Sequence, residues 1–200
     1  MTAADYTPAD YTPLVVSRIC HDLVSPLGAI ANGLELLTMT GSGPEAALIG
    51  ESVANANARI RAFRIAFGAA APGQRVTRAE LDALTEDLSR SGRLAIHWPL
   101  AADIERREAK LVLLALQCIE TLMPWGAEVR VGPRGAGVAV VARSARIREA
   151  PDLFDRLAGR GPDTPPEAAH VQFALLPLEA AAQGRPLSVE TGDGALTLAF

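Results

Sequence analysis

The sequence predicts an α+β protein in which an antiparallel helical hairpin is followed by an α/β sandwich. In residues 16–37 and again in residues 49–67, apolar side chains recur at alternating steps of four and three, the spacing that two packed helices need. After residue 74 the pattern changes to helices interleaved with short apolar strands. Only 4% of the 200 residues are aromatic, so the core must consist mainly of Leu, Ala, Val and Ile, which suits packed helices.

Residues 13–72 form the predicted hairpin, and residues 1–12 are expected to be a disordered leader. The turn lies at 41–44, where two glycines and a proline stop one helix and start the next. We expect the first helix to pack through Val16, Cys20, Leu23, Leu27, Ile30, Leu34 and Leu37. The second helix would pack through Ile49, Val53, Ala56, Ile60, Phe63 and Phe67.

Apolar residues beside the first of these seams predict a further partner for the hairpin. Ile19, Val24, Ala31 and Leu36 lie off the seam, so a single hairpin would leave them in water. Two copies can bury them by forming a four-helix bundle, and we therefore expect a homodimer. The C-terminal half of the same chain could cover them instead.

Residues 75–200 form the predicted α/β sandwich. Helix 77–91 begins with Thr77 and carries Glu80 three residues later, a pair that caps a helix N-terminus reciprocally. Turns at 132–135 and 192–194 separate two pairs of strands. The other expected elements, in chain order, are strand 93–99, helix 104–123, strands 128–131 and 137–142, helix 152–158, helix 166–183, and strands 187–190 and 195–200.

His21 is the residue on which the functional prediction rests. It falls one position off the expected seam, on a stripe that continues through Ser25, Gly28 and Asn32. These side chains are small or polar, so a globular partner could come close to a solvated imidazole, which can accept a phosphoryl group. Pro26 removes a helical hydrogen bond and should kink the helix just after His21. An ordinary surface histidine beside a tolerated bend is the alternative.

Composition and charge argue against several other classes of protein. A formal net charge of −4 and a pI near 5.4 do not fit a nucleic-acid-binding protein. Cys20 and Cys118 fall in apolar stretches, where we expect both to be buried in a reducing compartment, and no zinc spacing is present. The N-terminus does not have the pattern of a signal peptide, and we expect no segment to span a bilayer. The expected protein is cytoplasmic, with no membrane or nucleic-acid partner.

Residues 17–37 resemble a known phosphoacceptor segment. His21 and Asp22, with Pro26 on the same helix of a hairpin, are similar to the phosphoacceptor box of histidine-kinase dimerisation domains. The order of elements from residue 93 onward is similar to the ATP-binding domain of these kinases. The string 17–37 as a whole resembles the ChpT-type histidine phosphotransferases of alphaproteobacteria. This resemblance implies a dimeric four-helix bundle followed by a degenerate ATPase-like domain at 75–200.

Two departures from the kinase pattern favour a phosphotransferase over a kinase. The helix that carries the Mg²⁺-binding asparagine of a kinase has no asparagine here between residues 113 and 122. Residues 143–148 stand where a kinase has the glycine-rich loop that holds adenine. Without these groups ATP and Mg²⁺ have no electrostatic site. We therefore expect no cofactor and no metal in this chain, with Mg²⁺ on the partner receiver domain.

The resemblance implies a histidine phosphotransferase of a phosphorelay, which forms phosphohistidine at His21. Its partners would be the receiver domains of a hybrid histidine kinase and of response regulators, and its output would be control of the cell cycle or of motility. Two alternatives stay open. One is an ATP-dependent sensor histidine kinase with an atypical nucleotide site, and the other is a non-catalytic dimeric interaction module.

The neighbours of His21 have predicted roles of their own. Asp22 would bias the tautomer and orientation of the imidazole, or would be a solvated carboxylate about 100° around the helix. Ser25 lies within reach of the phosphoryl group, or bonds back to the helix backbone beside the proline. Arg18, Gly28 and Asn32 are the residues expected to bind a receiver, with Arg18 steering its acidic face.

Other polar and aromatic residues carry weaker signals. We interpret His97 and His170 as structural. Trp125 or Met123 belongs either to a surface that docks the receiver or to the core. Three arginines of the second helix could also steer a receiver, although surface arginines are usually only solvated: Arg59, Arg61 and Arg64.

Overall fold

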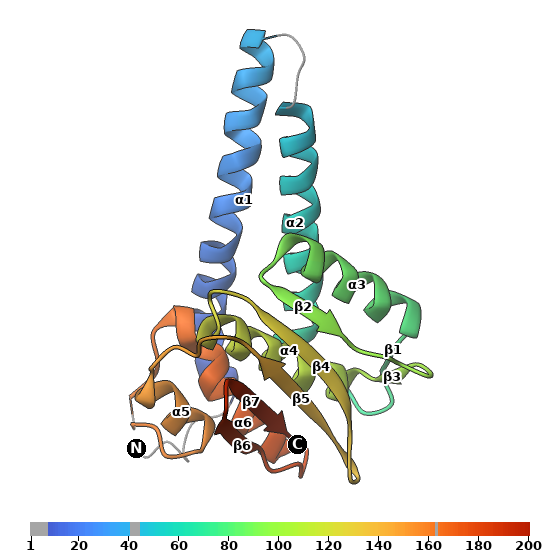
Figure 1. Cartoon of the computed structure of the whole chain (residues 1–200), viewed down its shortest axis with the longest axis vertical. Helices are drawn as coiled ribbons and strands as arrows, with labels where there is room; N and C mark the ends of the chain where they lie inside the picture. Colours follow the sequence, from blue (N-terminus) through green and yellow to red (C-terminus); the bar gives the residue numbers. More distant parts are fainter. Residues whose placement is uncertain (1–7, 41–44, 163) are drawn as a thin grey trace.

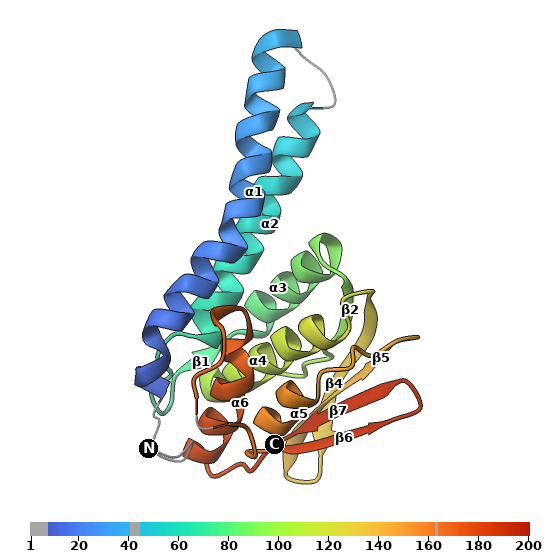
Figure 2. The same ribbon diagram turned by 90° about the vertical axis from the view of Figure 1, so that its left-hand side faces the viewer.

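The chain folds into a helical hairpin whose lower half rests on an α/β domain (Figure 1). In the computed structural model, residues 8–40, 45–162 and 164–200 are described. Helix α1 spans Thr12–Thr40 and helix α2 spans Glu45–Ala66, and the two run antiparallel. The turn predicted at 41–44 lies outside the described residues. The upper half of the hairpin projects away from the rest of the protein (Figure 2).

The face of α1 that packs against α2 coincides only in part with the predicted one. Of the predicted seam, Leu23, Ile30 and Leu37 are half-buried. Val16, Leu27 and Leu34 are 52 to 57% exposed in a single chain, and Cys20 is exposed as well, which corrects the prediction that it is buried. The packed face lies about 100° further around the helix and has smaller and more polar members, among them Asp22, Pro26 and Gly33.

Small residues let the two helices approach each other closely. A Cβ added to Gly33 would lie 2.6 Å from Cγ1 of Ile49 on α2. Pro26 is buried, and α1 continues through it without a break. The more apolar stripe of α1 is therefore left over, free to contact another surface.

The first described residues are ordered, which corrects part of the predicted leader. Pro8–Tyr11 form a 3₁₀ turn, η2, that leads directly into α1. The Tyr11 ring is buried in the main core, where it anchors the start of α1. Disorder was thus wrong for residues 8–12, and residues 1–7 lie outside the described part of the chain.

The α/β domain is built on a five-stranded sheet of order β2-β4-β5-β7-β6, in which only the β2–β4 pair is parallel. A separate small sheet pairs β1 with β3. The elements are β1 (Arg75–Val76), α3 (Arg78–Ser91), β2 (Leu94–His97), β3 (Ile104–Glu105), α4 (Arg106–Leu122), β4 (Ala127–Arg134), β5 (Gly137–Arg143), α5 (Pro151–Leu157), η3 (Ala168–His170), α6 (Val171–Ala182), β6 (Ser188–Gly192) and β7 (Ala195–Ala199). This confirms the predicted α+β fold class.

Local sequence signals explain most of these bounds. The Thr77 side chain accepts a hydrogen bond from the backbone N–H of Glu80 at 3.1 Å, which is one half of the predicted reciprocal cap, while the Glu80 side chain pairs with Arg64 at 2.9 Å. The turn between β4 and β5 comes later than predicted, since Pro133 pairs opposite Val138 and the chain reverses at Gly135. The predicted helix 166–183 becomes regular only at Val171, after the short η3. Strands β1 and β3 are two residues long, too short for a periodic signal.

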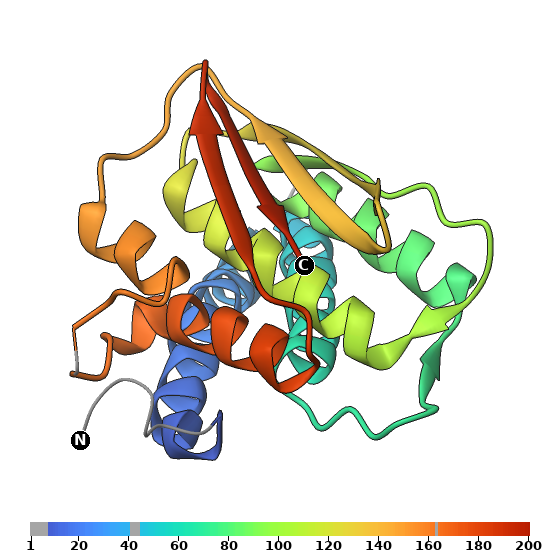
Figure 3. The same ribbon diagram turned by 90° about the horizontal axis from the view of Figure 1, so that it is seen from below.

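Helix α4 is the centre of the core. Leu111, Ala115 and Cys118 are buried in the domain, and Cys118 is buried as predicted. The sheet covers one face of α4, while α2 and α6 pack against others. Figure 3 shows this layering, with the sheet on one side of the domain helices and the hairpin on the other. Because α2 packs on α4, the base of the hairpin is fixed relative to the domain.

Helix α1 passes a simple test for a membrane-spanning segment, which corrects the expectation that no stretch would do so. Thr12–Leu37 is long and apolar enough by length and composition, and little of its apolar window is buried within the chain. The physical cause is the exposed apolar stripe just described. Such a result is weak evidence by itself, because a helix that packs against a partner protein has the same composition.

Candidate active site

His21 projects into solvent from the lower part of α1. Its side chain is 80% exposed, and its Nδ1 atom lies 3.1 Å from Oδ1 of Asp22. If Nδ1 carries the proton and donates it to this carboxylate, the lone pair of Nε2 faces outward. The imidazole is therefore both accessible and oriented by a neighbouring acid.

Asp22 lies in the groove between the two helices, because its position is about 100° around α1 from that of His21. Its side chain is only 9% exposed, which excludes the alternative of a freely solvated carboxylate. The Nε atom of Arg18 donates to Oδ2 of Asp22 at 2.8 Å, and Nη1 of Arg59 on α2 lies 3.7 Å from the same oxygen. Each oxygen of the Asp22 carboxylate thus has separate partners.

Both arginines also reach the α/β domain. Arg18 donates through Nη1 to the backbone carbonyl of Ala169 in η3. Arg59 places Nη2 at 3.4 Å from Oε1 of Glu120 on α4, and its Nε donates to Oδ1 of Asn55 at 3.2 Å. Residues far apart in the sequence therefore meet next to the exposed histidine.

A cleft of about 720 Å³ opens between the hairpin and the domain, and His21 is in its wall. Its lining carries four arginines against two carboxylates, so the cleft is cationic overall. The arginines are Arg18, Arg59, Arg93 and Arg148, and the carboxylates are Asp22 and Glu120. A cationic concave surface raises the local concentration of an acidic partner.

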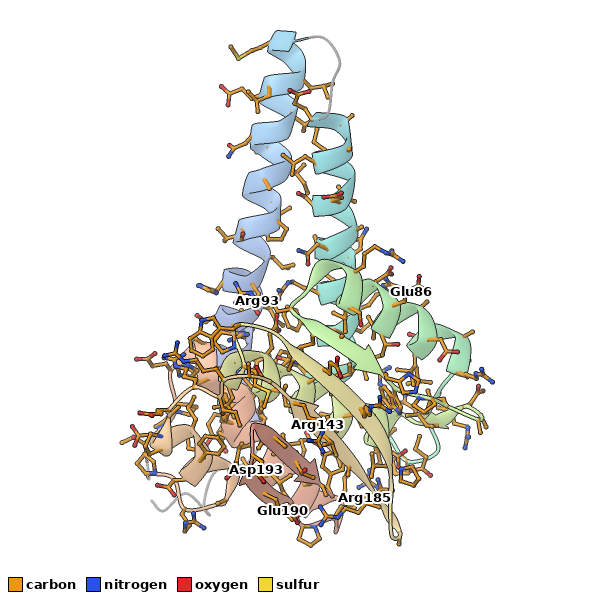
Figure 4. All side chains as sticks on the ribbon, viewed as in Figure 1. Glu86, Arg93, Arg143, Arg185, Glu190 and Asp193 are labelled. Atoms are coloured by element: carbon orange, nitrogen blue, oxygen red, sulfur yellow. The ribbon has the colours of Figure 1, made fainter. Side chains whose placement is uncertain are left out.

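Two of these arginines come from the domain side and were not predicted. Arg93 lies between α3 and β2, where Figure 4 shows it on the side of the domain that faces α1. Arg148 follows β5 in the segment that precedes α5. Neither guanidinium has an ion-pair partner within the described part of the chain, so both are available to an anionic ligand.

The remaining predicted site residues lie on α1, on the polar stripe of His21 or beside it. Ser25 is exposed and lines the cleft one turn from His21. Gly28 and Asn32 are exposed too, further up the hairpin and beyond the cleft lining. Arg18 lines the cleft, but its side chain is only 12% exposed and its guanidinium is bonded within the protein. The structure thus brings Arg18, Asp22 and Ser25 to His21, with Gly28 and Asn32 at the periphery.

His170 is a second histidine in the same cleft, although we interpreted it as structural. It ends η3, and its ring packs edge-on against Phe173 with 6.1 Å between the ring centroids. Partial burial lowers the pKa of His170 below its usual value, which favours the neutral imidazole. His97, by contrast, is exposed on β2 and does not line the cleft.

No cluster of three or more His, Cys, Asp or Glu side chains able to hold a metal ion occurs among residues 8–40, 45–162 and 164–200. Met123 and Trp125, the two residues assigned either to a docking surface or to the core, differ in burial. Met123 is fully buried in the core. Trp125 is 57% exposed and stacks under the guanidinium of Arg146, whose Cζ lies 4.3 Å from the ring centroid.

A solvated histidine with an adjacent acid, on a helical hairpin that a sheet domain supports, defines a protein that carries phosphoryl groups on histidine. Comparison with known proteins supports this class of protein. Residues 78–195 match the family model of the histidine phosphotransferase C-terminal domain. The chain is 32% identical over 187 residues to the protein phosphotransferase ChpT of Brucella abortus (strain 2308), with 90% of each chain covered.

A solved structure shows the same fold. It is titled "1.7 Angstrom Structure of a Bacterial Phosphotransferase", and it matches with a TM-score of 0.80 and 28% identity, over 100% of this chain and 99% of the other. The chain belongs to the histidine phosphotransferase family, as the segment 17–37 predicted. It is a histidine phosphotransferase of a phosphorelay.

Proposed function

We propose that His21 is the phosphoacceptor, and that it takes the phosphoryl group from the aspartyl phosphate of one receiver domain and passes it to the aspartate of another. The single observation that carries this assignment is the pairing of an 80% exposed imidazole with the nearly buried carboxylate of Asp22 through Nδ1. No other histidine among the described residues combines exposure with such a carboxylate contact.

The chemistry follows from the tautomer that this contact favours. With the proton on Nδ1, the Nε2 lone pair attacks phosphorus in line, and the bond from phosphorus to the receiver's carboxylate oxygen breaks with its electron pair staying on that oxygen. The imidazole becomes positively charged, and the Asp22 carboxylate at 3.1 Å stabilises this charge. The same steps in reverse phosphorylate the second receiver.

Other residues would assist from the cleft. Ser25, exposed one turn from His21, can donate its hydroxyl proton to a phosphoryl oxygen. Arg18 would contribute its charge to the cleft, while Gly28 and Asn32 offer a flat surface for the receiver helix that approaches. Mg²⁺ would be supplied by the receiver domain, and no cofactor is proposed for this chain.

The partners proposed are a receiver of a hybrid histidine kinase and the receivers of response regulators, in the cytoplasm, with cell-cycle or motility control as output. Similarity to a relative named protein phosphotransferase ChpT supports partners of this class. The excess of arginines in the cleft supports an acidic docking face on each of them.

A homodimer through the exposed stripe of α1 is also proposed. Val16, Cys20, Val24, Leu27, Ala31 and Leu34 recur at steps of four and three, and all are exposed in one chain. Val53 and Ile60 extend the apolar surface onto α2. His21 lies about 120° around the helix from Leu27, so a second copy would leave it accessible.

A second copy fits this surface better than lipid does. Crossing a bilayer would place Arg18 and Asp22 in hydrocarbon, at a cost of about 2.5 to 3.5 kcal/mol for each charged residue. Leu27→Arg should give a monomer in light scattering coupled to size exclusion, whereas Asn32→Arg on the neighbouring stripe should leave a dimer. A wild-type monomer, or a dimeric Leu27→Arg protein, would contradict the proposed interface.

The phosphoacceptor is tested with a purified receiver that carries a labelled aspartyl phosphate. The wild-type chain should acquire acid-labile phosphate, and His21→Ala should acquire none while keeping the thermal stability of the wild type. Label that appears from ATP alone would favour the kinase alternative. Relay from receiver to receiver that persists in His21→Ala would instead mean that the chain acts only as an interaction module.

A further inference from the structure

Resting on the proposed role of His21, we propose that Arg59 and Glu120 are positioning residues for phosphotransfer. Glu120 belongs to the α/β domain, Arg59 to α2 and Asp22 to α1, and together they form a chain of ion pairs that ends at the phosphoacceptor. Through this chain, the domain holds the histidine in its reactive orientation.

The two oxygens of the Asp22 carboxylate have different partners. Oδ1 faces Nδ1 of His21, while Oδ2 accepts from Arg18 and faces Arg59. A carboxylate that is free to rotate would exchange its two oxygens and move off the imidazole. Two guanidinium groups on Oδ2 prevent this, and the 9% exposure of the side chain leaves water little access as a substitute.

The domain also holds each of the two arginines at its far end. Arg18 donates to the Ala169 carbonyl, and Arg59 contacts Glu120 at 3.4 Å. Arg59 is also fixed on its own helix by its bond to Asn55. A guanidinium is a rigid planar fork, so fixing some of its nitrogens fixes the direction of the rest.

The consequence for the reaction is geometric rather than chemical. Neither Arg59 nor Glu120 contacts His21 within the described structure. Removing either residue should therefore change the orientation of the imidazole, while the attacking group itself stays the same. In-line attack is sensitive to small misplacements of the attacking atom. Loss of the brace should therefore lower kcat while the affinity for the receiver stays nearly the same.

A matched pair of substitutions on α4 tests this. Glu120→Ala removes the ion pair between Glu120 and Arg59, whose side chains are 30% and 26% exposed, respectively. Glu108→Ala removes the ion pair between Glu108 and Arg185. Glu108 lies at the other end of α4, and the two side chains are similarly exposed, at 23% and 33%, respectively. Figure 4 shows Arg185 on the side of the domain away from the hairpin. The two variants differ in whether the broken pair leads to His21.

We expect Glu120→Ala to lower kcat for transfer from a phosphorylated receiver about tenfold, with KM changed less than twofold. Glu120→Gln keeps an acceptor oxygen for Arg59 and should restore most of the rate. Arg59→Lys, which keeps the charge but not the fork, should resemble Glu120→Ala. The ¹⁵N chemical shifts of the His21 ring should show a smaller fraction of the Nδ1–H tautomer in Glu120→Ala, and Glu108→Ala should match the wild type in every measurement.

The outcomes separate this proposal from the assignment of His21. An active His21→Ala protein would overturn the assignment of the phosphoacceptor. If His21→Ala is inactive but Glu120→Ala keeps the wild-type kcat and tautomer, the positioning role is wrong. A rise in KM alone would show that Glu120 contacts the receiver, which also overturns it. Equal losses in Glu120→Ala and Glu108→Ala would show a general effect of weakening α4, and the positioning role would again be wrong.

Discussion

Two glycines of α1 provide a matched test of how the hairpin is built. Both are inside the same helix, but their surroundings differ. A Cβ added to Gly28 would meet nothing within 4 Å, whereas one added to Gly33 would lie 2.6 Å from Cγ1 and 3.2 Å from Cδ1 of Ile49. Alanine at either position removes the conformational freedom that glycine has in the unfolded chain. Only at Gly33 does it also collide with α2.

The expected free energies have opposite signs. Gly28→Ala should stabilise the protein by about 0.5 to 1 kcal/mol, the difference in helix propensity between the two residues. For a chain of this size that corresponds to a rise in Tm of about 1 to 4 °C. Gly33→Ala gains the same propensity but must displace a β-branched side chain from a packed contact, which costs about 1 to 3 kcal/mol. Its net effect should be a lower Tm.

Thermal unfolding followed by circular dichroism checks both values. All variants must be measured at one fixed protein concentration, because the Tm of a protein that dimerises depends on it. A destabilised Gly28→Ala, or a Gly33→Ala that is as stable as Gly28→Ala, would refute the packing described here.

Gly28→Arg extends the test to function. It should raise the KM for the receiver about tenfold while leaving the fold intact, if Gly28 lies under the docked receiver as proposed. An unchanged KM would remove Gly28 from that surface.

Two further predictions concern titration and thiol reactivity. Burial lowers the pKa of His170 in the folded protein, so the unfolded chain takes up a proton first as the pH falls below about 6.5. The free energy of unfolding should therefore decline below that pH. Chemical denaturation at a series of pH values should show a smaller decline for His170→Gln. Burial raises the pKa of the Cys118 thiol, which should react with a thiol reagent only after unfolding. Cys20 should react rapidly in monomeric Leu27→Arg and slowly in a wild-type dimer, whereas equally fast labelling in both would contradict the interface.

The hairpin could be predicted from periodicity, but not the side through which its helices pack. Apolar residues recur on two adjacent stripes of α1, and periodicity assigns the more apolar stripe to the intramolecular seam. The structure assigns the seam to the stripe with Asp22, Pro26 and Gly33, since the carboxylate is paired there and the small residues allow close approach. Pairing of this kind cannot be seen in one helix alone, because the partner arginine is on the other.

One signal for that partner was present in the sequence. The face of α2 that the structure buries runs through Ser52, Ala56 and Phe63, and Arg59 falls on the same four-three series, so a charged residue occupies that face. A charge on a seam requires a partner of opposite sign across it, and Asp22 is the candidate on α1. Arg93, Arg148 and the neighbourhood of His170 gave no comparable signal, because each lies more than 70 residues from His21 in the sequence.

The α/β domain contributes to phosphotransfer even though the phosphoacceptor is on the hairpin. A hairpin without it would expose Ala62, Ile65 and Ala66, which are buried in the domain core, so the base of α2 would lose its support. It would also lose the far-end partners of Arg18 and Arg59, and with them the fixed carboxylate beside His21. The domain thus supports the hairpin and, in the proposal above, orients its histidine through the same contact surface. We therefore expect a phosphotransferase of this kind to need its α/β domain even though it is not expected to use ATP.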